Sequence, residues 1–328
     1  MDITTLSFIQ LVEQGKLSLE DEVAKYLPEF EDMNVALVYE KGKMPWEWPN
    51  KDTKVKPAEN KIKIHQLMSM TSGLSYNILW SEDIKKVKEE TSNQASTREI
   101  VKAIAKGTLL FEPGTRYSYS LGHDVLVAVV EVVTDMRFSE YMKKNVFEPL
   151  GIRDMYYQVP KSEEARVASR YNIDENGHLK RDVINVTRVT DQFESGGGGL
   201  SCTVDEYMKI VEALSNDGIG GTGAQILSRE SIDEMRKNRL NEKVLEDFHG
   251  VGKKGYGYGL GVRTLIDKST SKSPVGEFGW DGAAGAYVLV DPENHIGIFY
   301  AHSAATPLDI WNIVHPTIRD KVYEAIFD

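Results

Sequence analysis

Apolar residues recur at helical spacing through much of the first two-thirds of the chain. Near the start, Leu6, Ile9 and Leu11 share one face of a predicted helix, and Gly15 can end it in a left-handed cap. Residues 124–133 are apolar nearly all round, which predicts a central buried helix. Further helices are expected within residues 84–107 and at 141–146, 203–218 and 228–236.

The pattern changes to strands after residue 256. Four runs predict antiparallel strands, at 256–262, 275–280, 286–290 and 296–301. A final helix is expected over 308–327, with a kink at Pro316. This order predicts an α/β fold of the α+β type, in which terminal helices flank an antiparallel sheet and a helical lobe is inserted. We expect one domain over residues 1–328, with a helical lobe at about 63–240 and a sheet lobe from 1–62 and 241–328.

Composition and charge exclude several classes of partner. The net charge is -11 and no long basic block is present, which disfavours binding to nucleic acid or to anionic membrane surfaces. Cys202 is the single cysteine, so no internal disulfide is possible, and no Cys and His spacing indicates a zinc site. We expect no metal and no cofactor. The chain has neither a membrane-spanning apolar run nor a secretory signal pattern, which predicts a cytoplasmic protein.

Two loops carry the candidate chemistry. The loop at 112–124 places Tyr119 where it becomes the central buried helix, and the loop at 279–285 brings glycines to the start of a predicted β-hairpin. Glycine in a strand lets a ligand approach the backbone closely. Gly196–Gly199 adds a third flexible segment, but no Gly-Lys-Ser/Thr follows it, so it is not a phosphate-binding loop.

These loops and five further segments resemble one superfamily in the same order along the chain. The segments are 11–21, 67–74, 111–115, 196–203 and 291–293. They are similar to the serine β-lactamases and penicillin-binding proteins, including class C β-lactamases, D-alanyl-D-alanine carboxypeptidases and esterases. The resemblance implies a β-lactamase/transpeptidase-like fold and serine hydrolysis of a small amide or ester through an acyl-enzyme, without a cofactor.

The resemblance assigns a role to the first loop. Tyr119 matches the tyrosine of the YxN motif, whose phenol exchanges protons with the nucleophile and the leaving group. A phenol with a pKa of about 10 needs a neighbouring cation for this work; the alternative is a buried aromatic at a helix start. Leu121 replaces the motif's Asn, which argues against a standard β-lactam substrate. His123 either faces the same pocket or is packed at the helix end.

The second loop aligns with the superfamily's KTG or HxG strand. Trp280, Asp281 and Gly282 occupy the three motif positions, and the backbone amide of Ala283 then falls where the second oxyanion donor is found. Trp280 removes the cation that would recognise a carboxylate, so an ester or small amide is favoured over a β-lactam. Structural glycines in a hairpin are the alternative interpretation.

The nucleophile's motif, SxxK on a helix, is not found where the resemblance requires it. The motif's Lys would fall at or just before Met1, and the only SxxK string is Ser269–Lys272 in a polar stretch between strands. Ser7 has Gln10 three positions on and is expected to be a packing residue. We therefore expect an N-terminally truncated serine hydrolase, esterase-like in preference to β-lactamase. The competing hypothesis is a catalytically inactive ligand-binding or scaffold homologue, and an exposed sheet edge would favour a homo-oligomer.

Overall fold

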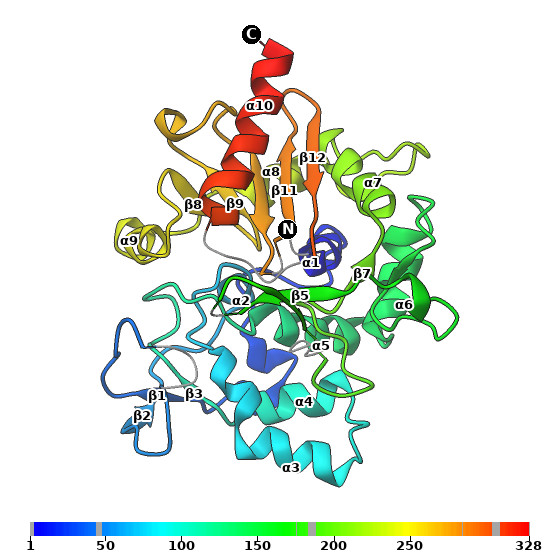
Figure 1. The fold of residues 1–328 in the computed structure, drawn as a ribbon. Coiled ribbons are helices and arrows are strands. Elements are labelled where there is room, and N and C mark those ends of the chain that lie inside the picture. The colour runs from blue at the N-terminus through cyan, green and yellow to red at the C-terminus, as the bar shows by residue number, and fades with distance from the viewer. Residues whose placement is uncertain are drawn as a thin grey trace.

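The computed structural model describes residues 3–43, 48–174, 176–182, 188–283, 285–303 and 309–327. A sheet covered by helices on both faces stands on a lobe made mostly of helices (Figure 1). The N-terminal end of the described chain lies between the two parts, and the C-terminal end lies at the far tip of the sheet part (Figure 1). The predicted α+β fold with an inserted helical lobe is confirmed.

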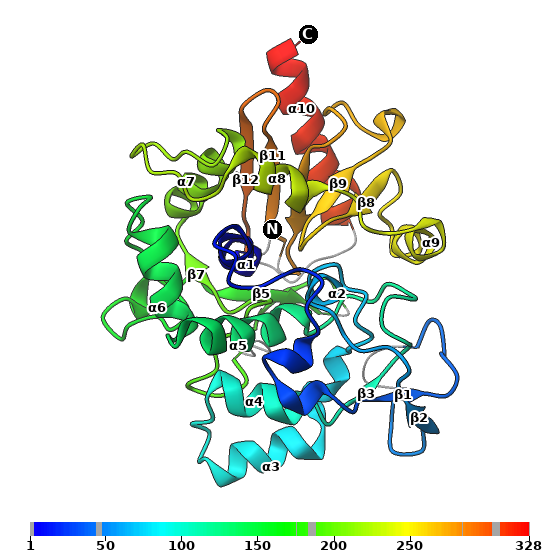
Figure 2. The ribbon, with the colours of Figure 1, turned by 180° about the vertical axis from the view of Figure 1, so that it is seen from behind.

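The main sheet has five antiparallel strands in the order β12-β11-β10-β9-β8. Their bounds are β8 Tyr256–Tyr258, β9 Arg263–Leu265, β10 Phe278–Asp281, β11 Tyr287–Asp291 and β12 Ile296–Tyr300. Helix α10 (His315–Phe327) covers one face, and α1 (Thr4–Glu13), α7 (Val204–Ser215) and α8 (Arg229–Arg236) lie on the other (Figures 1 and 2). Helices therefore cover both faces of the sheet.

The strand predicted over 256–262 is a hairpin. The chain turns after Tyr258, where the Gly259 amide bonds the Val262 carbonyl at 2.8 Å, and returns as β9. Gly261 has a φ of +74°, and a Cβ there would lie 2.2 Å from the Thr5 hydroxyl oxygen, so this turn requires glycine. The apolar run alone could not reveal the reversal, because both arms are buried.

The helical lobe is built around α5 (Gly122–Thr134), which is the predicted central helix and is buried through Val130. It ends at Asp135, which adopts a left-handed conformation with a φ of +53°. The other helices of this lobe are α2 (Ile64–Met68), α3 (Glu82–Glu90), α4 (Thr97–Ile104) and α6 (Phe138–Met142). Helix α9 (Glu242–Gly250), which the sequence reading missed, packs beside β8.

Strand pairing moves the lobe boundaries away from the predicted residues 62 and 240. Strand β1 (Asn34–Ala36) pairs with β2 (Val55–Pro57) and with β3 (Thr108–Leu109), so residues 34–57 belong with the helical lobe. Helix α7 packs on β12 and β11 of the main sheet. Two small two-stranded antiparallel sheets complete the strands, β4 (Met155–Tyr156) with β7 (Ser201–Cys202) and β5 (Arg170–Ile173) with β6 (Leu179–Asp182).

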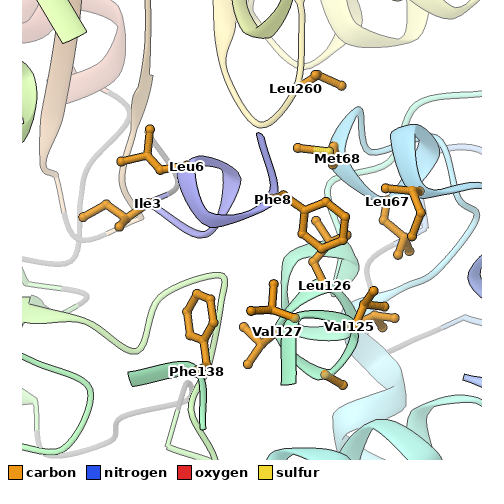
Figure 3. Close-up of a cluster of buried hydrophobic side chains, with 14 of the residues drawn as sticks. Ile3, Leu6, Phe8, Leu67, Met68, Val125, Leu126, Val127, Phe138 and Leu260 are labelled. Atoms are coloured by element: carbon orange, nitrogen blue, oxygen red, sulfur yellow. The ribbon is translucent and has the colours of Figure 1, made fainter. Parts of the chain in front are cut away.

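One apolar core joins the two parts (Figure 3). Phe8 on α1 is fully buried and lies between Leu126 of α5 below it and Met68 of α2 above it, with Leu260 of the sheet part beyond Met68 (Figure 3). Because α1 contributes to both parts, its burial fixes how the sheet sits on the helical lobe. The ends of β10 and α5 are positioned by this shared core.

The last helix begins with a π-helical turn at Ile310–Val314 before α10. Pro316 lies where the π-helical turn passes into α10, and the wider turn before it is a way in which a helix accommodates a residue without an N–H donor. Leu308, the predicted first residue, lies outside the described residues.

Two Val→Ala substitutions on α5 test the core. Val127 is fully buried and Val132 is 43% exposed. We expect V127A to lower the free energy of unfolding by about 2 kcal/mol, because two buried methyl groups are replaced by a cavity. We expect V132A to change it by less than about 0.5 kcal/mol. Urea denaturation followed by circular dichroism measures both, and equal effects would contradict the burial assigned to this helix.

Candidate active site

Tyr119 and Trp280 meet face to face at the junction of the two parts. Tyr119 precedes α5 and Trp280 is on β10, 161 positions later by their sequence numbers, yet their ring centroids are 5.3 Å apart and their planes differ by 13°. Both residues are partly buried. The structure therefore brings together the two loops that the sequence analysis singled out.

Aromatic rings hold this pair in place. Tyr258 meets the Trp280 ring edge-on at 5.1 Å, and Phe248 of α9 stacks on Trp280 at 6.5 Å. On the side of the helical lobe, the ring centroid of Tyr76, in the 3-10 turn Tyr76–Trp80, lies 6.1 Å from that of Tyr119. Stacked and edge-on aromatic pairs each contribute about 0.5–1.5 kcal/mol beyond their burial, so the cluster fixes the two rings.

The tetraglycine segment connects this cluster to the first turn of α1. The Thr4 hydroxyl donates to the Gly196 carbonyl at 2.9 Å. A Cβ on Gly197 would lie 3.4 Å from the Tyr76 hydroxyl and 3.4 Å from a carboxylate oxygen of Asp124. The N-terminal end of α1, the Gly196–Gly197 turn and Tyr76 are therefore neighbours, and Tyr76 leads to Tyr119.

The side chain of Asp281 is a buried charge centre behind the site. Its carboxylate pairs with the Lys253 amine at 2.5 Å, with the His315 Nδ1 at 3.0 Å and with the Arg263 Nε at 3.5 Å. Only 6% of the Asp281 side chain is exposed. The sequence analysis grouped Asp281 with the substrate strand, and the structure turns its carboxylate to protein partners.

Opposing effects act on the pKa of Asp281. Burial alone would raise the pKa, but Arg263, His315 and Lys253 together hold it far below its usual value. Next to this centre, burial raises the pKa of Glu277 against the pull of Arg263, and Tyr256 donates to Glu277 at 2.8 Å. The carboxylate of Asp281 therefore stays ionised, and its partners form a fixed buried cluster.

The turn after β10 is held at both ends. The Gly282 amide donates to the Ala286 carbonyl at 2.7 Å, and the Gly285 amide donates to the Gly282 carbonyl at 2.9 Å. Gly285 has a φ of +90°, and a Cβ there would collide with the His302 ring at 1.8 Å. Only glycine fits at 285, which explains the spacing of glycines that the sequence displays. Ala283 is exposed on this turn.

The other predicted residues are placed as follows. Leu121 is 1% exposed and belongs to the main apolar core, so its side chain supports α5. His123 is also 1% exposed and lies beside the sheet turn, with its Nε2 3.1 Å from where a Cβ on Gly261 would be. Ser7 is fully buried and donates to the Thr4 carbonyl at 2.6 Å, as a packing residue would.

The only SxxK string does not form a catalytic pair. The Ser269 hydroxyl donates to Asp267 at 2.7 Å, and the Lys272 amine pairs with Glu324 of α10 at 2.6 Å. The two side chains are engaged with different partners, at the edge of the sheet part. This agrees with the expectation that Ser269 is not the nucleophile.

Sequence reasoning missed the residues that support the site from the C-terminal helix. Trp311 and His315 are four positions apart and both contact the 281–285 turn. Their i, i+4 spacing was readable, but nothing in the sequence indicated that this helix face meets β10. Lys253, between α9 and β8, was likewise not singled out from the sequence.

Membrane-spanning helices and metal-binding clusters are both absent from the described ranges. No helix there is long and apolar enough to cross a membrane. Within the same ranges, no group of three or more His, Cys, Asp or Glu side chains is arranged to hold a metal ion.

Comparison with known proteins gives a family model and several relatives. The model described as Beta-lactamase matches residues 3–321. Protein Rv1367c of Mycobacterium tuberculosis is 30% identical over 91% of this chain and 74% of its own length. Lovastatin esterase of Penicillium rubens is 28% identical over 98% of this chain and 82% of its own length.

Solved structures share the fold. The unliganded simvastatin synthase LovD from Aspergillus terreus superposes with a TM-score of 0.76 at 19% identity, over 99% of this chain and 82% of that chain. EstCE1, a hydrolase with promiscuous acyltransferase activity, gives a TM-score of 0.73 at 23% identity, over 98% of this chain and 82% of that chain.

An Asp281→Asn substitution tests the buried charge centre. Removing the carboxylate leaves Arg263 and Lys253 buried with unbalanced charge, so we expect the free energy of unfolding at pH 7 to fall by about 3–5 kcal/mol. The surface control D52N should change it by less than about 0.5 kcal/mol.

The pH dependence follows from the lowered pKa of Asp281. Its contribution to stability is complete above the pKa of the unfolded chain, about 3.9, and is lost as the pH falls further. Urea titrations at pH 7 and pH 3 should show the difference between wild type and D281N narrowing at the lower pH. A constant difference would contradict the assigned ion pairs.

Proposed function

The chain belongs to the Beta-lactamase family, and on that premise we propose that it serves serine-dependent hydrolysis or transfer of an acyl group from a small ester. The observation that carries the proposal is the stack of Tyr119 on Trp280 at 5.3 Å, because it joins a tyrosine proton carrier to the substrate strand. In this proposal Tyr119 exchanges a proton with the nucleophile and leaving group, and the Ala283 amide donates to the oxyanion.

Charge at the site supports an ester over a carboxylate-bearing β-lactam. Trp280 stands where the family's substrate strand carries Lys. The nearest amine, that of Lys253, is 5.8 Å from the Trp280 ring centroid and is paired with Asp281. Leu121 is buried in the core and offers no side-chain amide to a substrate. Relatives named lovastatin esterase and esterase EstB are in agreement with this substrate class.

The nucleophile is proposed to lie outside the described residues, at the N-terminal end of α1. Ser269 and Lys272 are bound to other partners, and Ser7 is buried against Thr4. The first turn of α1 touches the Gly196 turn, which leads through Tyr76 to Tyr119. A Ser and a Lys placed beside this first turn of α1 would therefore lie close to Tyr119.

A second candidate function is ligand binding without covalent chemistry. It is favoured by one observation, that the only SxxK string of the sequence does not form a contacting pair. Two further proposals, on the compartment and on the oligomeric state, hold for either function. The protein is proposed to be cytoplasmic, and β12, at one end of the main sheet, is proposed as the edge through which a homo-oligomer would form.

A labelling experiment separates the two functions. A fluorophosphonate probe is added to the polypeptide of residues 1–328 and to the product of the complete reading frame, followed by intact-mass and peptide analysis. We expect no stoichiometric adduct on the first and one adduct, at the Ser of a helical SxxK, on the second. Stoichiometric labelling of any serine within 1–328 would contradict the placement of the nucleophile. A complete product that neither labels nor hydrolyses p-nitrophenyl butyrate would favour ligand binding.

Tyr119→Phe tests the proposed proton carrier. In the product of the complete reading frame, the variant keeps the ring that stacks on Trp280 and loses only the hydroxyl, so kcat for p-nitrophenyl butyrate should fall by about 10²–10⁴-fold. Tyr156→Phe is the matched control, because its hydroxyl bonds Asp154 away from the site. Unchanged kcat in Y119F would exclude Tyr119 from proton transfer.

A further inference from the structure

The carbonyl oxygen of Gly282 accepts two hydrogen bonds. One comes from the Gly285 amide within the turn at 2.9 Å, and the other from the indole Nε1 of Trp311 at 3.3 Å. Trp311 lies in the π-helical turn Ile310–Val314, which directly precedes α10. A half-buried indole that donates to a turn carbonyl fixes the direction of that carbonyl.

The peptide that carries this carbonyl also carries the Ala283 amide. In a trans peptide the C=O and the following N–H lie in one plane and point in opposite directions. Whatever holds the Gly282 oxygen therefore sets the direction of the Ala283 N–H. Two donors on one carbonyl also polarise the peptide, which makes its N–H a stronger donor.

His315, one helical turn after Trp311, holds the other end of the same turn. Its Nε2 lies 3.1 Å from the Gly285 carbonyl oxygen, and its Nδ1 lies 3.0 Å from Asp281. The ring is 1% exposed and stacks on Tyr287 of β11 at 4.8 Å. Both ring nitrogens lie within hydrogen-bonding distance of an oxygen of this turn. The start of the C-terminal helix thus contacts both ends of the 281–285 turn.

We propose that Trp311 is a positioning residue for acyl transfer, because its indole N–H orients and polarises the Gly282–Ala283 peptide whose amide donates to the oxyanion. The inference rests on the proposed function and deepens it. Its physical content is preorganisation: a donor already aimed at the developing charge needs no reorganisation during the reaction. His315 supports the same turn from its second end.

A purely structural Trp311 would fill space against the turn without directing the amide. Two replacements separate these roles. Trp311→Phe keeps an aromatic ring and removes the N–H, and replacement by 3-benzothienylalanine keeps the bicyclic shape with sulfur in place of the N–H. Trp80→Phe is the control, since Trp80 is 62% exposed and lies in another turn. Thermal melting verifies that each variant is folded.

The first readout does not depend on turnover. In protein labelled with ¹⁵N-alanine, the Ala283 amide proton resonance should move upfield in both Trp311 variants and stay in place in Trp80→Phe. The loss of a donor from the Gly282 carbonyl weakens the polarisation of that one peptide. An unchanged Ala283 resonance in the benzothienyl variant would overturn the proposal.

The second readout is the split between kcat and KM for p-nitrophenyl butyrate with the product of the complete reading frame. We expect kcat to fall about tenfold and KM to stay within about twofold, because the lost interaction acts on the transition state. A rise in KM with unchanged kcat would overturn the positioning role. If the unsubstituted protein shows no turnover, the proposed function fails, and the Ala283 resonance alone decides whether Trp311 directs this amide.

Discussion

The site depends on one buried charge centre, the carboxylate of Asp281 held by Arg263, Lys253 and His315. Taking these charges out of water is costly, and the cost is offset only while all partners stay in place. The cluster therefore joins three parts of the chain that approach it from different directions: β9, the loop before β8 and the C-terminal helix. The same contacts hold the turn that follows Asp281 in one position. That turn carries the Ala283 amide, which is proposed to bind an oxyanion.

A second constraint, the apolar core shared by both parts, fixes the position of Tyr119 relative to the sheet. Helix α1 contributes Phe8 to the core shared by both parts of the molecule, so the sheet cannot shift relative to α5 without opening that core. Tyr119 lies just before α5 and Trp280 lies near the end of β10. Because the core fixes α5 against the sheet, it also holds these two rings in their stacked contact. The shared core and the charge centre together explain how two distant loops converge.

The sequence was informative where local chemistry and spacing decide the structure. The central helix before Asp135, the helix that begins near Thr203 and the loop glycines were readable because helical periodicity and backbone conformation are local properties. The family resemblance located Tyr119 and Trp280 as a pair. The roles of Trp311 and His315 were not readable, because they arise from a helix meeting a strand about thirty residues earlier in the chain.

The same limit explains the misread elements. The strand predicted over 256–262 covered β8 and the turn after it, because the run of Tyr, Leu and Val continues to Val262, and residues 34–57 were grouped with the sheet lobe because their pairing with β3 is long-range. Asp281 lies on β10 as the alignment placed it, but the sequence did not indicate that its carboxylate pairs with Arg263, Lys253 and His315, because these contacts are long-range. In each case the structure was decided by contacts between residues far apart in the sequence, which a local pattern does not reveal.

The central claim is that Tyr119 and the Ala283 amide line one acyl-transfer site at the N-terminal end of α1. The most direct measurement is a crystal structure of the complete reading-frame product after reaction with a p-nitrophenyl phosphonate. The account predicts phosphorus bonded to a serine beside the first turn of α1, a phosphonyl oxygen about 2.7–3.1 Å from the Ala283 nitrogen, and the Tyr119 hydroxyl beside the serine oxygen. A phosphonyl group attached elsewhere, or an oxygen directed away from the 282–285 turn, would contradict it.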